Sequence, residues 1–294
     1  MEKNKKKRQK DMKDFVIEKR NEVNSMINNE FSLIEYKIFC VYLSRINARD
    51  ENTRSVEITI EDFQSVLGVN NISITAIRAV VERLSKRQIH IPEKNCFDQY
   101  KTYNVFSVCK IVKITGRWIL QLDVDGDILP LIFDFKEQYV TYRLKNVIGL
   151  KSTTQMRMYE ILKQYEKIGE RELEISDLKK LLGISEKKYT RWDNLKKYVI
   201  DSCKEVLEKN TDLRFDYKRG GSEIGGKWIT IVFSIYANPA TKGHSSSSYE
   251  EDLDNDDLQP DSENDEDGFD TDDLRLSASH DEDADDELQR LPLF

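Results

Sequence analysis

The chain contains one short phrase twice. Residues 58–69 read ITIEDFQSVLGV, and residues 173–184 read LEISDLKKLLGI. When Gly68 is aligned with Gly183, the apolar and acidic positions of the two stretches coincide as well. A repeat at a fixed offset reveals how many units follow one structural plan. We therefore expect two copies of one supersecondary unit.

The residues around the first copy predict a complete small motif. Ser32 and Glu35 have capping-box spacing, which predicts a helix from Leu33 to about Ile46. Apolar alternation and turn residues then predict a strand, two helices separated by a turn at Gly68, and a hairpin. These segments are 55–60 for the strand, 61–67 and 73–88 for the helices, and 102–115 with 117–124 for the hairpin.

The second copy repeats this order. Ser152 and Gln155 have the same capping spacing ahead of an amphipathic helix, and Gly183 follows the short helix. The expected segments are 154–168, 171–175, 176–182, 192–209, and the hairpin 213–219 with 227–236. Trp192, Leu195, Val199 and Val206 form the expected core side of the long helix. A helix-turn-helix followed by a hairpin is the winged-helix plan, so we expect an α+β fold of two tandem winged helices.

Charge divides the chain further. Residues 241–294 hold 20 acidic side chains and three basic ones, a net charge of −17. Subtracting them from the totals of 54 and 46 leaves 34 acidic and 43 basic residues in 1–240, or +9. A basic body with an acidic tail predicts a polyanionic partner for the body. We expect a flexible arm at 1–14, winged helices at 15–147 and 148–240, and a disordered acidic tail at 241–294.

Composition argues against several protein classes. No apolar run reaches the roughly 18 residues that a membrane-spanning helix needs, so we expect no membrane association. The four cysteines are far apart, which predicts a reduced, cytoplasmic protein in which they are small buried hydrophobes (Cys40, Cys96, Cys109 and Cys203). No GxSxG, HExxH or complete nucleotide-binding motif occurs. We expect no enzyme activity, no cofactor and no metal.

Two motifs resemble ligand sites but do not fit them. Gly221, Gly226 and Lys227 match part of a phosphate-binding loop, yet Trp228 stands where Ser or Thr should be. A strand is also expected to follow, whereas such loops direct a helix N-terminus at the phosphate. The other motif, LDVDGDIL with Asp123, Asp125 and Asp127, lacks the remaining ligands of a calcium loop. We interpret it as a polar turn.

Three stretches carry a resemblance to a known family. They read KRNEVNSMINNEFSLIEYKIF, FKEQYVTYRLKNVIGLKSTTQMRMYEILKQYEKIGERELEISDLKKLLGI and YTRWDNLKKYVIDSCKEVLEKNTDLRFDY. The chain from about Val16 to Tyr236 is similar to the initiator Rep proteins of iteron-containing bacterial plasmids. The resemblance implies two winged helices that bind repeated origin sites as monomers. It also implies dimers, joined through the first domain, that repress the protein's own gene, and main base contacts from the second domain.

The recognition segment of the second copy is rich in basic and amide side chains. Recognition helices contact bases from their N-terminal residues, and flanking basic residues hold phosphates. Arg can present two donors to guanine, and Asn a donor and an acceptor to adenine. The candidate DNA-binding residues are Lys187, Lys188, Arg191, Asn194, Lys196 and Lys197, with Lys218, Arg219 and Lys227 as phosphate contacts on the wing.

The first copy offers a second basic helix. Its residues Arg78, Arg83, Lys86 and Arg87 lie largely off the apolar stripe of the helix. Two interpretations stay open, because these side chains can contact DNA or only keep the helix face soluble.

The final residues differ from the acidic tail before them. Gln289, Leu291, Leu293 and Phe294 stand in an apolar terminus, QRLPLF. This resembles the glutamine–leucine–phenylalanine peptides that bind the sliding clamp, although one extra residue follows the glutamine. It is also similar to the Pro-Phe tip of bacterial single-strand-binding proteins, and a chance terminus is the third alternative. The first two predict a tethered hook for a replisome component.

We therefore predict a plasmid replication initiator that binds duplex DNA. Two alternatives remain: a winged-helix repressor without initiator activity, and a replication-restart scaffold that acts through protein contacts. An initiator requires several direct repeats beside an AT-rich segment, a repressor only one inverted repeat, and a scaffold would bind DNA weakly without sequence preference.

Overall fold

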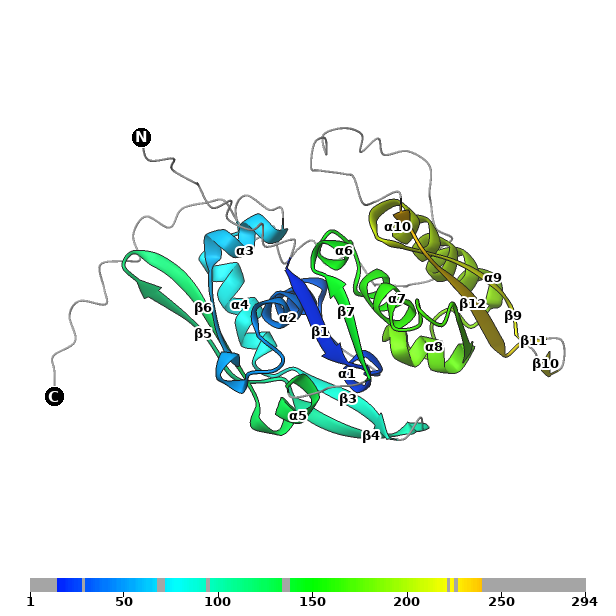
Figure 1. The fold of residues 1–294 in the computed structure, drawn as a ribbon, viewed down its shortest axis with the longest axis horizontal. Helices are drawn as coiled ribbons and strands as arrows, with labels where there is room; N and C mark the ends of the chain where they lie inside the picture. The colour runs from blue at the N-terminus through cyan, green and yellow to red at the C-terminus, as the bar shows by residue number, and fades with distance from the viewer. Residues whose placement is uncertain are drawn as a thin grey trace, which may run out of the picture.

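The computed structural model describes residues 15–27, 30–67, 72–93, 96–133, 138–220, 223–224 and 227–239, with the backbone alone for 223–224 and 227–228. The predicted arm 1–14, the turn at Gly68, the wing-tip Gly221 and Gly226, and the tail 241–294 lie outside these residues. The described chain forms an elongated body with two halves side by side (Figure 1).

The first half is the larger one. Its helices are α1 (Asn21–Asn24), α2 (Leu33–Arg45), α3 (Ile60–Leu67), α4 (Ile74–Leu84), α5 (Leu129–Ile132) and α6 (Lys145–Ile148). Its strands are β1 (Val16–Arg20), β2 (Ser55–Thr59), β3 (Gln88–Glu93), β4 (Cys96–Asn104), β5 (Phe106–Ile114), β6 (Arg117–Val124) and β7 (Tyr139–Arg143).

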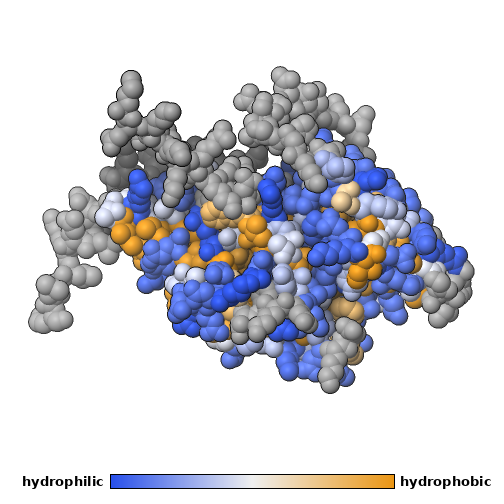
Figure 2. Space-filling view, in the orientation of Figure 1, coloured by the Kyte–Doolittle hydropathy of each residue, from blue (hydrophilic) through white to orange (hydrophobic). Residues whose placement is uncertain are grey.

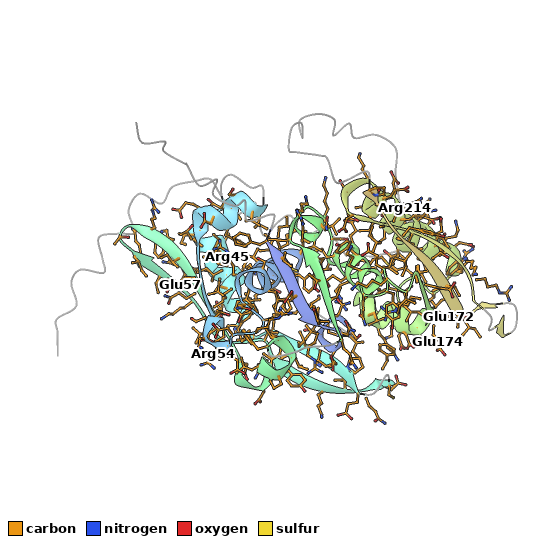
Figure 3. All side chains as sticks on the ribbon, viewed as in Figure 1. Arg45, Arg54, Glu57, Glu172, Glu174 and Arg214 are labelled. Atoms are coloured by element: carbon orange, nitrogen blue, oxygen red, sulfur yellow. The ribbon has the colours of Figure 1, made fainter. Side chains whose placement is uncertain are left out.

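The second half follows from α7 onward. Its elements are α7 (Thr153–Lys163), β8 (Glu170–Glu174), α8 (Ile175–Leu182), α9 (Trp192–Leu195), a π-helical turn (Lys196–Asp201), α10 (Ser202–Asn210), β9 (Leu213–Arg219), β10 (Glu223–Ile224), β11 (Lys227–Trp228) and β12 (Thr230–Ala237). Glu172 and Glu174 are exposed on the edge strand β8 (Figure 3), where charge disfavours pairing with another strand.

The predicted repeat is confirmed at the level of topology. Each half has a three-stranded antiparallel sheet, in the order β2-β6-β5 in the first half and β8-β12-β9 in the second. In both sheets the strand before the helix-turn-helix pairs with the last strand of the wing. Gly183 ends α8 in the left-handed conformation with φ 71°, as expected of a glycine at this position.

The two capping sites differ. At α2, Ser32 Oγ accepts from Glu35 N, Glu35 Oε2 accepts from Ser32 N at 3.0 Å, and Phe31 packs edge-on against Tyr36. At α7, Ser152 Oγ accepts from Gln155 N at 3.2 Å. The side chain of Gln155 accepts from Lys151 N at 3.0 Å instead of from the cap residue. The reciprocal half of the second capping box was therefore predicted wrongly.

The sequence also missed one hairpin. β3 and β4 pair with each other, whereas we expected a helix as far as residue 88 and a single strand over 102–115. α4 ends at Leu84, and the expected strand is divided at Val105, which is fully buried where the chain passes from one sheet to the next. The alternation of side chains continues through this crossing, so the pattern alone cannot show the break. Likewise, α7 ends at Lys163, where Arg171 donates to Ile161 O at 2.7 Å.

One hydrophobic core runs through both halves. β1 and β7 form a two-stranded sheet beside α7, and the connecting residues Leu144, Val147, Ile148 and Leu150 are buried. Cys40 and Cys203 are buried as predicted, but Cys96 is exposed. Burial raises the pKa of the Cys203 thiol to about 12. No helix among the described residues is long and apolar enough to span a membrane.

Candidate nucleic-acid interface

The second helix-turn-helix presents its recognition helix through a short, tightly held loop. Lys179, on α8, is only 6% exposed and directs its ammonium group at this loop. Its Nζ donates to Glu186 O at 3.3 Å and to Lys188 O. Burial lowers the pKa of Lys179. This lysine therefore fixes the loop that leads to the recognition helix, and nothing in the sequence separated it from its neighbour Lys180.

The loop contains a backbone conformation that residues other than glycine rarely adopt. Tyr189 has φ 52°, in the left-handed region. Its ring stacks on that of Tyr198, with the centroids 6.4 Å apart, and Lys197 Nζ lies 5.1 Å from the Tyr198 ring. Tyr198 is 55% exposed. An aromatic pair thus lies among the predicted basic residues, and it was not predicted from the sequence.

Most of the predicted recognition residues are on the surface of this segment. Arg191 is the residue that precedes α9, and Asn194 lies in the first turn of that helix. The exposed members are Lys187, Arg191, Asn194, Lys196 and Lys197, and Lys188 is half-buried. Trp192 packs against the core, as predicted. The structure therefore brings the predicted basic and amide groups together at the start of one helix.

The recognition helix changes its winding after its first turn. Residues Lys196–Asp201 are π-helical, which adds a residue to the turn and rotates the buried face. Leu195 and Val199 are buried as predicted, but Ile200, Cys203 and Leu207 continue the buried face, and the predicted Val206 is only half-buried. On a strictly regular helix Val206 would lie within about 20° of Leu195, so the shift of the buried face to Cys203 and Leu207 was not predicted.

Asp201 joins the helix to the wing. It accepts from Tyr217 OH, on β9, at 2.5 Å and from Lys196 Nζ at 2.9 Å. Burial alone would raise the pKa of Asp201, but these two hydrogen bonds and the charge of Lys196 lower it. Lys218 and Arg219 are exposed further along the same strand, and the side chain of Lys227 lies outside the described residues. The helix and the wing therefore form one surface.

The basic residues of the first half have different surroundings. Arg83 Nε lies 3.1 Å from Glu35 Oε1, Arg87 Nε lies 2.7 Å from Glu35 Oε2, and the Glu35 carboxylate is fully buried. Lys86 forms an ion pair with Glu82 at 3.1 Å. Arg78 is exposed and lies over the Trp118 ring of the first wing. Neither interpretation describes Arg83 and Arg87, whose contacts with the buried Glu35 carboxylate favour a structural role.

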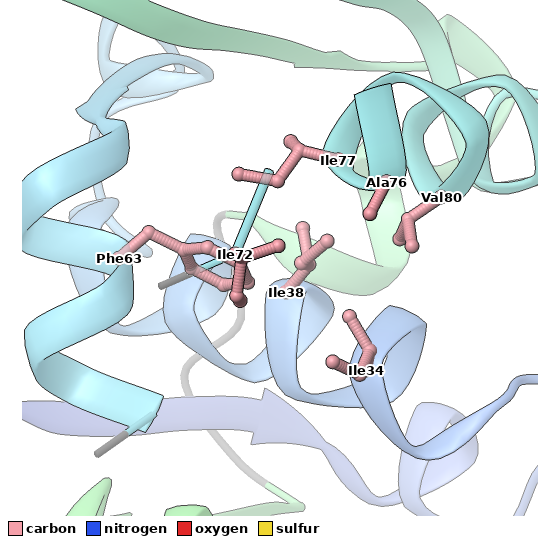
Figure 4. A pocket seen from close by; sticks show the side chains of 7 residues that line it. All are labelled: Ile34, Ile38, Phe63, Ile72, Ala76, Ile77 and Val80. Carbon is pink, nitrogen blue, oxygen red and sulfur yellow. The ribbon is translucent and has the colours of Figure 1, made fainter. Parts of the chain in front are cut away.

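Other features of the described chain offer no alternative chemistry. A small recess between α2, α3 and α4 is lined only by apolar side chains (Figure 4): Ile34, Ile38, Phe63, Ile72, Ala76, Ile77 and Val80. Asp125 caps a turn by accepting from Asp127 N, and Asp123 forms an ion pair with Arg54. The predicted polar turn is thus confirmed. Within the described residues no group of three or more metal-ligating side chains occurs.

Comparisons with known proteins agree with this architecture. A crystal structure of the Pi initiator protein in complex with iteron DNA matches with a TM-score of 0.64 and 17% identity, over 77% of this chain and 99% of that chain. This likeness shows the shared fold. Domains 2 and 3 of RctB match with a TM-score of only 0.39 and 11% identity, over 69% of this chain and 81% of that chain. No curated protein sequence matches the chain.

Two family matches cover most of the body. Residues 16–163 match the family described as "Initiator Replication protein, WH1", and residues 174–235 match "Initiator Rep protein, WH2". The two matches contain the first and the second helix-turn-helix, respectively. The chain therefore belongs to the initiator Rep protein family, with one winged helix of each type.

Proposed function

We propose that this initiator starts plasmid replication by binding repeated duplex sites, or iterons, at the origin. The observation that carries the proposal is the segment 187–197, whose exposed basic and amide side chains lie at the start of a recognition helix. Family membership supports it, and so does the fold shared with the Pi initiator, whose crystal structure holds iteron DNA. DNA binding of this kind requires no enzyme activity and no cofactor.

Footprinting of the full chain on DNA beside its own gene tests this function. We expect protection of several direct repeats next to an AT-rich segment, with an affinity at least about 10³-fold above that for random DNA. A single protected inverted repeat would indicate a repressor instead. Weak binding without sequence preference would indicate a scaffold, and either result would overturn the proposal.

We further propose that the protein also forms homodimers that repress its own gene, and that the monomer is the form active at the origin. β5 is the edge strand of the β2-β6-β5 sheet, and Val108 and Ile114 on it are 40% and 43% exposed. Figure 2 shows hydrophobic residues gathered over the β5–β6 hairpin. A partially apolar edge strand suits pairing between copies. Sedimentation of the wild type and of Val108→Lys tests this, because the charge should shift the equilibrium to monomer.

The C-terminal residues support a proposal from sequence alone. Gln289, Leu291, Leu293 and Phe294 would bind the sliding clamp or another replisome component of the host cytoplasm. We expect a peptide of residues 285–294 to bind its partner with roughly micromolar affinity. Deleting Leu293 and Phe294 should abolish partner binding by the full chain and leave iteron binding unchanged. If the deletion leaves partner binding unchanged, the terminus is not a docking peptide.

A further inference from the structure

The contact between the two halves is built around one buried guanidinium group. Arg157, on α7, is 0% exposed. Its Nη2 donates to Asn24 O at 2.8 Å and to Met26 O at 3.0 Å, both in the first half. Its Nε donates to Leu181 O at 3.2 Å, near the end of the positioning helix α8 of the second half. A single side chain thus donates hydrogen bonds to backbone carbonyl groups of both halves.

Glu160, one turn further along α7, completes the arrangement. Its carboxylate lies 3.0 Å from Arg157 Nη1 and 2.7 Å from Lys19 Nζ, on β1. It also accepts from Tyr36 OH at 2.5 Å and from Tyr142 OH. Burial alone would raise the pKa of Glu160, but the charges of Lys19 and Arg157 lower it, so the carboxylate stays ionised. We call Lys19, Tyr36, Tyr142, Arg157 and Glu160 the α7 network.

This network makes a change in the angle between the halves costly. Breaking a buried ion pair leaves an uncompensated charge away from water, and each of these groups is 3% exposed or less. Hydrogen bonds are also directional, whereas an apolar contact alone tolerates sliding. The connection between the halves adds to this stiffness, because Val147, Ile148 and Leu150 are buried. The two halves therefore have one strongly preferred orientation.

We propose that the α7 network makes the two winged helices a single rigid reader, which fixes the spacing and helical phase between the two DNA segments that they contact. The proposal rests on the proposed function and names positioning residues for it. One inserted base pair rotates the second segment by about 35° and moves it by about 3.4 Å. A rigid reader cannot follow that change, so one winged helix loses its contacts. A hinged protein would follow it.

The test compares the cognate site with sites carrying one or two extra base pairs between the two footprinted segments. Binding of the second of two linked modules adds about 10²–10⁴-fold to affinity. Wild-type full chain should therefore lose about 100-fold or more on the one-base-pair insertion. Arg157→Met and Glu160→Gln should lose less than about 10-fold, because their halves can reorient. Lys163→Met is the matched control, since the ion pairs of Lys163 within the described residues, with Asp212 and Glu166, both lie in the second half.

The outcomes separate this proposal from the proposed function. If the wild type binds no site specifically, the proposed function fails. If it binds specifically but tolerates the insertion, or if folded Arg157→Met keeps the full penalty, the rigid reader is overturned.

A second measurement covers the case in which the variants do not fold. Spin labels at Thr75→Cys and Glu205→Cys, in a Cys96→Ser background, report the distance between the two recognition helices of the otherwise wild-type chain; both positions are exposed. A single narrow distance distribution supports the proposal, and a broad one contradicts it.

Discussion

The two winged helices share a topology but use their basic residues differently. Counted from the cap serines, Glu35 of the first half corresponds to Gln155 of the second, since each is the third residue after its serine. Glu35 is ionisable, fully buried and contacted by Arg83, on α4, and by Arg87, just after this helix. Gln155 is neutral, and its side chain accepts from the nearby backbone N–H of Lys151. The first half therefore uses two arginines, one on its recognition helix and one just after it, to pair its own buried carboxylate.

The second half shows the opposite use. No buried acid faces its recognition helix at the corresponding cap, and Arg191, Asn194 and Lys197 are exposed. A buried carboxylate needs positive partners, because an ion left alone in the interior costs several kcal/mol. The difference at one cap position thus explains why a basic helix in one half stabilises the fold while a basic helix in the other is available for DNA.

A second pair of corresponding positions extends this comparison. Lys37 and Arg157 are each the fifth residue after the cap serine. Arg157 is fully buried and has several acceptors, whereas burial lowers the pKa of Lys37 to about 8. The cation of the second half bonds both halves, whereas burial disfavours the charged form of the cation in the first half.

The largest expected effect is at Glu35. Replacing both Arg83 and Arg87 by Met should lower the free energy of unfolding by about 2–3 kcal/mol, because the buried carboxylate loses its partners. Adding Glu35→Gln, which gives the first half the same neutral residue as Gln155 in the second half, should restore most of the lost stability. Denaturant unfolding measures both. At a temperature where the double variant is folded, its specific DNA affinity should change less than about threefold; a larger loss would show that these arginines contact DNA.

The next effect is at Arg191. Its replacement by Ala should cost about 1–3 kcal/mol of specific binding and weaken sequence preference, as expected for a base contact. Arg78→Ala is the control from the first half, and we expect a smaller loss that is equal for all sequences. Titration of cognate and random DNA separates the two results. An equal loss on both DNAs for Arg191→Ala would contradict the base-contact assignment.

Lys37 should make stability depend on pH. Its folded pKa of about 8 lies below the ordinary value of 10.5, so the unfolded chain binds more protons between these pH values. The free energy of unfolding therefore rises as pH increases from about 8 to 10.5. Below pH 8 the full penalty of burying the charged Lys37 is present. Lys37→Met should raise stability at pH 7 by about 1 kcal/mol, discounted for partial exposure, and the gain should vanish above about pH 10.5. A pH-independent difference would contradict this assignment.

The sequence predicted those parts of the fold that local patterns determine. The cap at Ser32, the helix that ends at Gly183 and the shared order of strand, helix-turn-helix and wing depend on neighbours in the chain, and these are confirmed. The β3–β4 hairpin and the end of α7 depend on contacts with distant residues, so periodicity could not locate them. The same limit applies to the candidate site. The basic residues were found by their clustering in the sequence, but only the structure reveals that Arg83 and Arg87 form ion pairs with Glu35.

The smallest expected effect separates the two wings. Lys218, on β9, and Lys113, on the first wing, are both exposed, but the Lys113 ammonium lies 5.3 Å from the Trp118 ring, which Arg78 also contacts. A lysine that neutralises one phosphate contributes about −0.9 to the slope of log K against log salt, whatever the DNA sequence. Lys218→Ala should therefore reduce the magnitude of that slope by about 0.9 and weaken binding to cognate and random DNA alike, by about 0.5–1 kcal/mol at moderate salt.

Lys113→Ala should leave the slope unchanged, because we expect the first wing to contribute little to DNA binding. Salt titrations of both variants show which wing contacts phosphates. An equal reduction in slope for both variants would mean that the two wings contact the duplex in the same way.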